Sequence, residues 1–128
     1  MISLQATESS MELDWLKRWA QLAPNRPALR CSDSCRSFSY RELFERSSSL
    51  AADLSRTYDL KKGDRVAVLA TNEPETFFLF FALQRVGAIL VPVNYRYTAR
   101  EVDHVLRDSG AKLFFHQQEF SSVVSALE

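Results

Sequence analysis

The fold is decided by residues 63–94, which read GDRVAVLATNEPETFFLFFALQRVGAILVPVN. Two short apolar runs, from Arg65 to Ala70 and from Ile89 to Val93, flank a longer run that is typical of a helix. Apolar runs without alternation fit strands that are buried on both faces of a sheet. Two such strands joined by a helix predict a parallel pair with a right-handed crossover.

The central helix carries signals for its start and its end. Asn72 is expected to be the N-cap, with Pro74 in the first turn and Glu75 three residues after the cap. Gly87 is expected to end the helix in the left-handed conformation. From Phe77 to Leu83 the helix is apolar almost all the way round, which predicts burial on more than one side.

Residues 76–93 are also about as long as a membrane span. That interpretation would place Gln84 and Arg85 in the middle of the bilayer, and Gly87 and Pro92 would break the helix well short of a full crossing. We therefore expect no membrane span.

Composition and charge indicate a globular domain of ordinary size. The 128 residues are 46% hydrophobic and 12% aromatic, which is enough to form a core. The 16 basic and 16 acidic residues cancel without a block of one sign, so neither nucleic acid nor an anionic membrane surface is an expected partner. No secretory signal pattern is present, so a cytoplasmic location is expected. Residues 1–10 are expected to be a disordered leader, and residues 11–128 a single α/β module.

The N-terminal part is predicted to form a helix and a hairpin. Apolar residues recur at helical spacing from Met11 until Pro24 and Pro27 stop the helix. Two short extended pieces, residues 28–31 and 36–38, then flank a turn composition at residues 32–34, which predicts an antiparallel hairpin.

Cys31 and Cys35 are the only cysteines. A disulfide between them would have to close across a tight turn, and a zinc site would need a second pair of ligands nearby. We expect reduced, structural cysteines.

Two capping boxes mark the start of further helices. One extends from Ser39 to Glu42 and the other from Thr98 to Glu101. The first helix is expected to end near Tyr58, and Gly110 should close the second. The predicted apolar stripes comprise Leu43, Ser47, Leu50, Ala51 and Leu54 in the first helix, and Val102, Val105 and Leu106 in the second.

A third buried strand is predicted from Leu113 to Phe115, followed by a last helix from Gln117 to Leu127. Strands that alternate with helices after Asp64 predict a three-layer α/β fold. Its sheet should be mostly parallel with helices on both faces, and the N-terminal hairpin should lie at one side or edge.

Ligands in such sheets bind beyond the carboxyl ends of the strands. The residues at these ends are Thr71 to Glu73, Asn94 to Arg96, and His116 with Gln117. All three glycines of the chain are isolated, so there is neither a dinucleotide fingerprint nor a P-loop. Asn72 is interpreted as a cap rather than as a ligand contact, since Glu73 and Glu75 would repel phosphate there.

Three further candidates have weak support from the residues alone. Glu101, His104 and Asp108 share a helical face and could hold a metal or act as an acid–base pair, but a solvated polar face explains them more simply. His116 ends a strand without a neighbouring nucleophile or carboxylate. Arg96 follows a strand in a loop before a capped helix, where a surface salt bridge is the alternative.

Several segments of the chain form a recognisable set in a fixed order. They are residues 38–43, 62–68, Asn72 with Phe77, 87–96, Thr98, Glu101 and 108–112. Together they resemble the beginning of the AMP-forming acyl-CoA synthetases, in the adenylate-forming superfamily with luciferases and peptide-synthetase adenylation domains. The resemblance extends from about Leu13 to the end, and the segment from Pro92 to Arg96 is more like the acyl-CoA ligase branch.

The resemblance implies an ATP-dependent ligase, for example of fatty acid metabolism, that converts a carboxylate to an acyl-adenylate and then to acyl-CoA. ATP, Mg and CoA are implied for the full-length enzyme but no cofactor for this part alone, because the phosphate loop and the catalytic residues come later than Glu128 in the family. No catalytic or metal-binding residue is therefore expected here, and the chain alone should be inactive. Only Arg96 matches a position near chemistry, at the border of the CoA nucleotide.

Two hypotheses follow. In the first, the chain is the N-terminal scaffold of a synthetase, and its partner is the remainder of that enzyme. In the second, it is a stand-alone interaction module derived from the same fold. A homodimer through the helix from Phe77 to Leu83 is also expected, with Phe78 and Phe81 proposed as contact residues. The acyl substrate is not identified.

Overall fold

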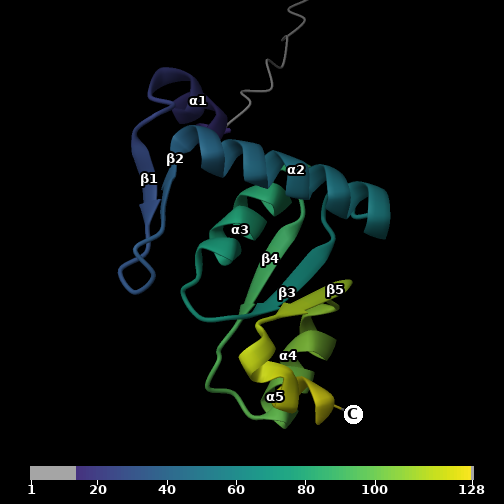
Figure 1. The fold of residues 1–128 in the computed structure, drawn as a ribbon. Helices are drawn as coiled ribbons and strands as arrows, with labels where there is room; N and C mark the ends of the chain where they lie inside the picture. The colour runs from purple at the N-terminus through teal and green to yellow at the C-terminus, as the bar shows by residue number, and fades with distance from the viewer. Residues whose placement is uncertain (1–13, 128) are drawn as a thin grey trace, which may run out of the picture.

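The chain folds into three layers, which Figure 1 shows in a computed structural model that describes residues 14–127. A parallel sheet of three strands lies between helices α2 and α3 on one face and helices α4 and α5 on the other. The predicted three-layer α/β fold is thereby confirmed. The predicted leader at residues 1–10 and the predicted helix start at Met11 lie outside the described residues.

The elements follow the predicted order. They are α1 (Trp15–Leu22), β1 (Pro27–Arg30), β2 (Ser37–Ser39), α2 (Tyr40–Tyr58), β3 (Arg65–Leu69), α3 (Pro74–Val86), β4 (Ile89–Val93), α4 (Ala99–Ser109), β5 (Leu113–His116), a 3-10 turn η1 (Gln118–Phe120) and α5 (Ser121–Ser125).

The strand order of the sheet is β4-β3-β5, and both pairings are parallel. Arg65 pairs with Ile89 on one side of β3, and Val66 pairs with Leu113 on the other. Alternate residues of β3 face opposite layers: Val66 packs in the cluster beneath α2 and α3, and Ala67 packs in the cluster beneath α4. This two-sided burial explains why the strand is an unbroken apolar run.

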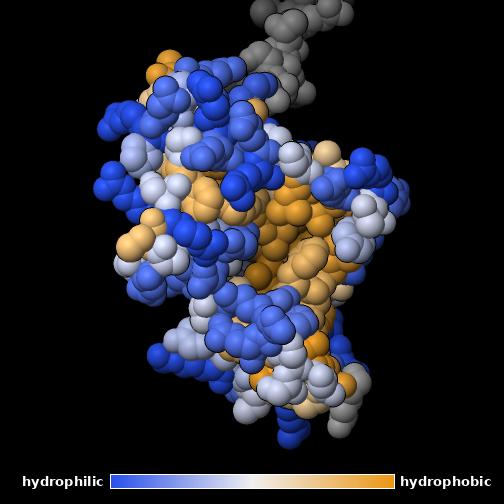
Figure 2. Space-filling model, in the orientation of Figure 1, coloured by the Kyte–Doolittle hydropathy of each residue, from blue (hydrophilic) through white to orange (hydrophobic). Residues whose placement is uncertain are grey.

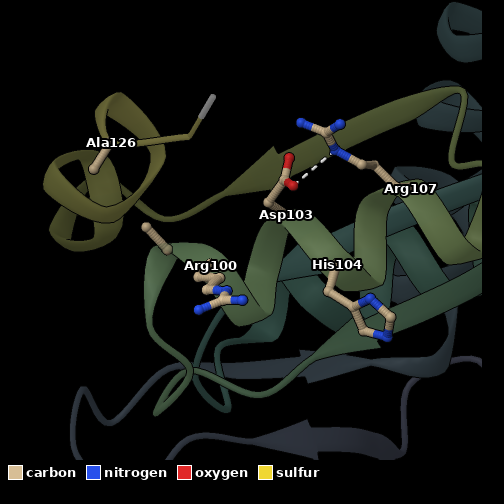
Figure 3. A pocket seen from close by; sticks show the side chains of 6 residues that line it. Arg100, Asp103, His104, Arg107 and Ala126 are labelled. Atoms are coloured by element: carbon tan, nitrogen blue, oxygen red, sulfur yellow. Dashed lines mark ion pairs between the residues drawn. The ribbon is translucent and has the colours of Figure 1, made fainter.

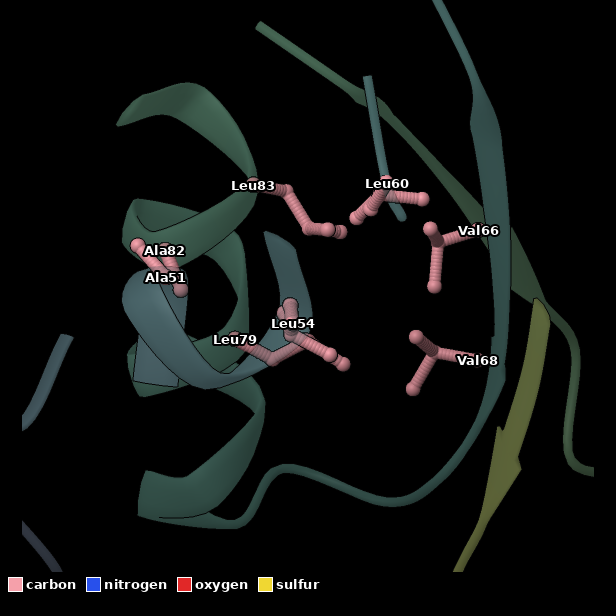
Figure 4. Packing of buried hydrophobic residues seen from close by; sticks show 8 residues of the cluster. All are labelled: Ala51, Leu54, Leu60, Val66, Val68, Leu79, Ala82 and Leu83. Carbon is pink, nitrogen blue, oxygen red and sulfur yellow. The ribbon is translucent and has the colours of Figure 1, made fainter. Parts of the chain in front are cut away.

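The larger cluster joins α2, α3 and β3. Leu54 of α2, Leu83 of α3 and Val66 of β3 are at most 2% exposed and face one another in Figure 4. The predicted stripe of α2 is confirmed, although Leu50 is only half-buried. Ser47 belongs to this stripe despite its hydroxyl, because Ser47 Oγ donates to the Leu43 carbonyl at 2.6 Å.

The start of α3 corrects one prediction. Its N-cap is Glu73 rather than Asn72, and no side chain accepts a hydrogen bond from the first turn. A residue before proline is pushed out of the α region, and Glu73 is extended with φ −94° and ψ 150° before Pro74. The helix can therefore begin only at Pro74, which leaves Asn72 one residue too early.

The exposed side of α3 corrects a second prediction. Phe78 is 7% exposed and packs edge-on against Phe38 at a centroid distance of 5.1 Å, so it is a core residue. The exposed phenylalanines are Phe77 and Phe80, at 44% and 45%. α2 covers the side of α3 that carries Phe78, and the sequence alone does not show which side that is.

Both capping boxes are confirmed. Ser39 and Thr98 each accept a hydrogen bond from the amide of the glutamate three residues on, and each glutamate accepts one in return. The predicted single helix from Gln117 to Leu127 is wrong in detail, since the 3-10 turn η1 precedes a short α5.

The N-terminal elements lie against the α2–α3 layer. The hairpin of β1 and β2 is antiparallel, as predicted. Leu16 of α1 is buried with Phe38 and Leu43 in a second cluster. Asp14 Oδ2 lies 2.8 Å from Arg85 Nη2 of α3, an ion pair whose angles fall short of a hydrogen bond.

Candidate functional site

The carboxyl ends of β3 and β5 are tied together by one side chain. Gln117 Oε1 accepts from the Thr71 amide at 2.6 Å and from Thr71 Oγ1 at 2.9 Å. The Gln117 amide in turn donates to the Leu69 carbonyl at 3.0 Å. Gln117 therefore fixes the position of both strand ends, at the edge where ligands of such sheets bind.

An apolar hollow, which we call the β5 groove, opens beside these strand ends. Figure 2 shows it as a hydrophobic depression in the middle of the molecule. Its volume is about 420 Å³. The groove is lined by Leu50, Val68, Ala70, Glu73, Glu75, Thr76, Leu79, Phe115, His116 and Gln117. Apolar side chains thus form its interior, and polar groups gather at the strand ends.

Two carboxylates at the rim of the β5 groove are paired with one arginine. Arg36 Nη1 donates to Glu75 Oε1 at 2.7 Å, and Arg36 Nη2 donates to Glu73 Oε2 at 2.8 Å. The hydrogen bond from Arg36 lowers the pKa of Glu75, and the same bond raises the pKa of Arg36. This cluster could not be predicted from the sequence, because no local pattern connects a hairpin residue to a helix start 37 residues away.

Arg96 lies in a turn between β4 and α4 whose backbone is fixed by two hydrogen bonds to Asn94. The Arg96 amide donates to Asn94 Oδ1 at 3.0 Å, and the Tyr97 amide donates to the Asn94 carbonyl at 3.0 Å. The guanidinium is exposed, with its Cζ 5.4 Å from the centroid of the Tyr95 ring. Within residues 14–127, no ion pair involves Arg96.

A polar pocket of about 710 Å³ lies along α4. Figure 3 shows Arg100 and His104 along the helix and the ion pair between Asp103 and Arg107. Of the three residues considered as ligands, Glu101 already accepts a hydrogen bond from the Thr98 amide as part of the capping box. This hydrogen bond lowers the pKa of Glu101. His104 and Asp108 are both exposed.

The remaining candidates are not brought together. His116 is exposed at the end of β5, with Nδ1 2.9 Å from the Gln117 carbonyl. Among the described residues, no group of three or more His, Cys, Asp or Glu side chains could hold a metal ion. Cys31 and Cys35 are both free. None of the helices between residues 14 and 127 is long and apolar enough to cross a membrane.

Comparison with known proteins identifies the family. The model of the AMP-binding enzymes matches residues 16–128. The chain belongs to the AMP-binding enzyme family. The alternative of a stand-alone interaction module derived from the same fold is not favoured by this match or by the ligases that the chain resembles.

Two curated relatives are similar to most of this chain. The fatty acid–[acyl-carrier-protein] ligase ScoC of Streptomyces coeruleorubidus is 39% identical over 108 residues, which cover 84% of this chain and 20% of the relative. Feruloyl-CoA synthase from an Amycolatopsis species is 38% identical over 113 residues, which cover 88% of this chain and 22% of the relative. The chain therefore spans about a fifth of the length of these relatives.

Solved structures agree with the fold. The N-terminal domain of FACL13 from Mycobacterium tuberculosis matches with a TM-score of 0.81 at 31% identity, over 88% of this chain and 29% of that one. The N-terminal subdomain of NpsA from Klebsiella oxytoca, in complex with 3-hydroxyanthranilyl-AMSN, matches with a TM-score of 0.76 at 34% identity, over 88% and 27%. The chain thus corresponds to an N-terminal portion of a larger ligase.

Proposed function

We propose that this chain is the N-terminal scaffold of an ATP-dependent acyl-CoA synthetase that acts in the cytoplasm and forms an acyl-adenylate before transfer to CoA. The observation that carries the proposal is the family match over residues 16–128, together with a fold shared with N-terminal domains of ligases. The partner of the scaffold is then the remainder of the same enzyme.

The chain alone would not bind the triphosphate of ATP. Its helix start nearest the strand ends, at α3, carries Glu73 and Glu75 rather than a glycine-rich loop with a lysine. Both carboxylates already form ion pairs with the nearby cation, Arg36. Phosphate affinity in proteins comes from convergent backbone amides and a neutralising cation. ATP and Mg would therefore be held by later parts of the enzyme.

Arg96 fits a contact to the nucleotide phosphates of CoA. Its guanidinium is exposed and without an ion pair in the described part of the chain, and the turn at Asn94 fixes its backbone. A charge-assisted hydrogen bond to a phosphate contributes roughly 1.5–3 kcal/mol. When bound, CoA would supply the thiol that accepts the acyl group, while Arg96 would hold its nucleotide end.

A chimera tests the scaffold role. Residues 14–128 of this chain would replace the matching region of the Amycolatopsis feruloyl-CoA synthase, and pyrophosphate exchange and CoA-ester formation would be measured. We expect the chimera to be active and the 128-residue chain to be inactive. In the chimera, Arg96→Ala should raise KM for CoA roughly 10- to 100-fold and leave adenylate formation unchanged. Arg100→Ala, an exposed cation on the next helix, is the matched control.

A homodimer is a second proposal, which the exposed side chains of α3 support. Phe77 and Phe80 are each nearly half exposed on the outer side of this helix. Contacts between two copies would bury the two rings together.

A further inference from the structure

Both cysteines of the chain lie in one loop. Residues 31–36 connect β1 to β2 at the outer end of the hairpin (Figure 1). Cys31 is half-buried and Cys35 is exposed, and both thiols are free. Structural cysteines are buried and inert, whereas reactive cysteines are partly exposed. The exposure of both side chains therefore favours reactive over purely structural cysteines.

The hairpin register brings the two cysteines close together. Arg30 pairs with Ser37, and one step further the Cys31 amide donates to the Arg36 carbonyl at 2.8 Å. Opposite Cα atoms in an antiparallel pair are about 4.5–5.5 Å apart, and consecutive Cα atoms are about 3.8 Å apart. Cys35 directly precedes Arg36 in the chain. A disulfide between Cys31 and Cys35, which needs Cα atoms about 4.4–6.8 Å apart, therefore requires at most a small movement of the loop.

One of the two thiols is activated by its neighbours in the loop. Arg36 Nε donates to Ser34 Oγ at 3.1 Å, which leaves the hydroxyl hydrogen of Ser34 for another acceptor. Hydrogen bonds from the Ser34 hydroxyl and the Ser34 amide lower the pKa of the Cys31 thiol. Partial desolvation and the charge of Glu73 oppose this effect without reversing it. Because the thiolate is the form that attacks an electrophile, Cys31 is the nucleophile of the pair.

Arg36 is anchored outside the loop as well. Its Nη1 donates to Glu75 at 2.7 Å, and its Nη2 donates to Glu73 at 2.8 Å. The guanidinium thus extends from the start of α3 to the loop, and its remaining donor, Nε, reaches Ser34. The ion pairs hold Arg36 in place, and Arg36 in turn holds the hydroxyl of Ser34. Ser34 is therefore a positioning residue for the Cys31 thiol.

We propose that Cys31 and Cys35 form a redox-active pair that a hydroperoxide oxidises to a disulfide. The Cys31 thiolate attacks the terminal oxygen of the hydroperoxide and breaks the O–O bond, which leaves a sulfenic acid at Cys31. The released alkoxide takes up the proton that Cys31 has lost and leaves as an alcohol, or as water from hydrogen peroxide. The Cys35 thiol then attacks the sulfur of the sulfenic acid, and water leaves as the disulfide forms.

The electrons balance in this sequence. Two thiols lose two electrons in forming the disulfide, and one hydroperoxide takes up both. A small thiol can return the pair to the reduced state by thiol–disulfide exchange. The inference is independent of the ligase function, since it uses only residues of the hairpin loop and their contacts.

Intact mass after treatment with hydrogen peroxide tests the pair. We expect the 128-residue chain to lose about 2 Da, the two hydrogens of a disulfide, and dithiothreitol to restore the original mass. In Cys35→Ser the reaction should stop at a sulfenic acid that dimedone labels. Cys31→Ser should react about tenfold more slowly than Cys35→Ser, because it lacks the activated thiol.

Ser34→Ala tests the activation of Cys31. Alkylation by iodoacetamide is measured against pH with Cys35→Ser in the background, so that only Cys31 reacts. Loss of the Ser34 hydroxyl should move the midpoint of the profile to higher pH and slow alkylation at pH 7. Ser32→Ala is the matched control and should leave the profile unchanged, since the Ser32 hydroxyl donates to Asp33 Oδ1 at 2.9 Å.

Four results would overturn the inference. They are oxidation to a sulfinic acid without a disulfide, a disulfide-linked dimer in place of the internal bond, equal rates with hydrogen peroxide for the two single cysteine variants, and an alkylation profile that Ser34→Ala leaves unchanged.

Discussion

Arg36 and Glu75 are 39 residues apart in the sequence, and their side chains meet at 2.7 Å between Nη1 and Oε1. Arg36 reaches Glu73 as well, at 2.8 Å, so one side chain of the hairpin joins both carboxylates at the start of α3. This start has no side-chain cap. The arginine thus links the hairpin to a helix start that has no side-chain cap.

Replacing Arg36 by alanine should destabilise the chain modestly. The side chains of Arg36 and Glu75 are 39% and 61% exposed, so solvent screens the pair and the loss in the free energy of unfolding should be small. Arg36→Lys should restore only part of the stability that is lost in Arg36→Ala, because the ammonium of lysine cannot bridge two carboxylates as the planar guanidinium of arginine does. Urea unfolding measures both. Arg56→Ala, which breaks an exposed pair within α2, is the control, and an equal loss in both variants would contradict a linking role.

A glycine at position 35 should stabilise the hairpin. Cys35 has φ 53°, in the left-handed region where a Cβ is strained. Glycine adopts this conformation freely, so Cys35→Gly should raise the free energy of unfolding by about 0.5–1 kcal/mol after its larger chain entropy is counted. Ser32→Gly, in the same loop at a position without positive φ, should destabilise. A lower thermal midpoint for Cys35→Gly would show that the loop does not hold this strain.

The protonation of the two capping-box glutamates should contribute to a loss of folding stability at acid pH. The pKa of Glu42 is lowered by the hydrogen bond from the Ser39 amide, and the pKa of Glu101 by the bond from the Thr98 amide. A lowered pKa in the folded state contributes stability that is present above the unfolded value, about 4.3, and is lost as the pH falls through the folded value. The thermal midpoint should therefore decrease below about pH 4.5.

The matched variant is Glu42→Gln with Glu101→Gln. Glutamine keeps an acceptor for the capping amides but does not titrate, so the double variant should start less stable at pH 7 and lose less between pH 5 and pH 3. Thermal melts across this range give the comparison. Parallel curves for the two proteins would mean that other carboxylates, such as Asp64 with its lowered pKa, account for the acid sensitivity.

Local sequence patterns predicted the start of a helix correctly where a single signal marks it. The capping boxes at Ser39 and Thr98 were found because both partners of each lie within four residues. At α3 two local signals compete: Asn72 is a good cap, but Pro74 forces the residue before it to be extended, and the backbone constraint prevails. The cap was therefore misplaced by one residue.

The candidate site was only partly predictable. The strand ends that carry Thr71 and Gln117 follow from the strand positions, but the hydrogen bonds between them depend on β3 and β5 being neighbours. The order β4-β3-β5 cannot be read from alternation of strands and helices. The sequence also does not show which side of α3 is exposed, because this helix is apolar all round. The packing of α2 against α3 determines the exposed side.

The last prediction concerns self-association through α3. Phe77 and Phe80 keep nearly half of their surface exposed, so each would gain about 1 kcal/mol if a second copy buried it. Phe80→Lys should therefore weaken a dimer without unfolding the chain. Phe78→Ala, at a buried neighbouring position, should instead cost about 3–5 kcal/mol in the free energy of unfolding. Sedimentation equilibrium and urea unfolding separate the two effects, and a monomer at millimolar concentration for the unmodified chain would show that α3 needs no partner.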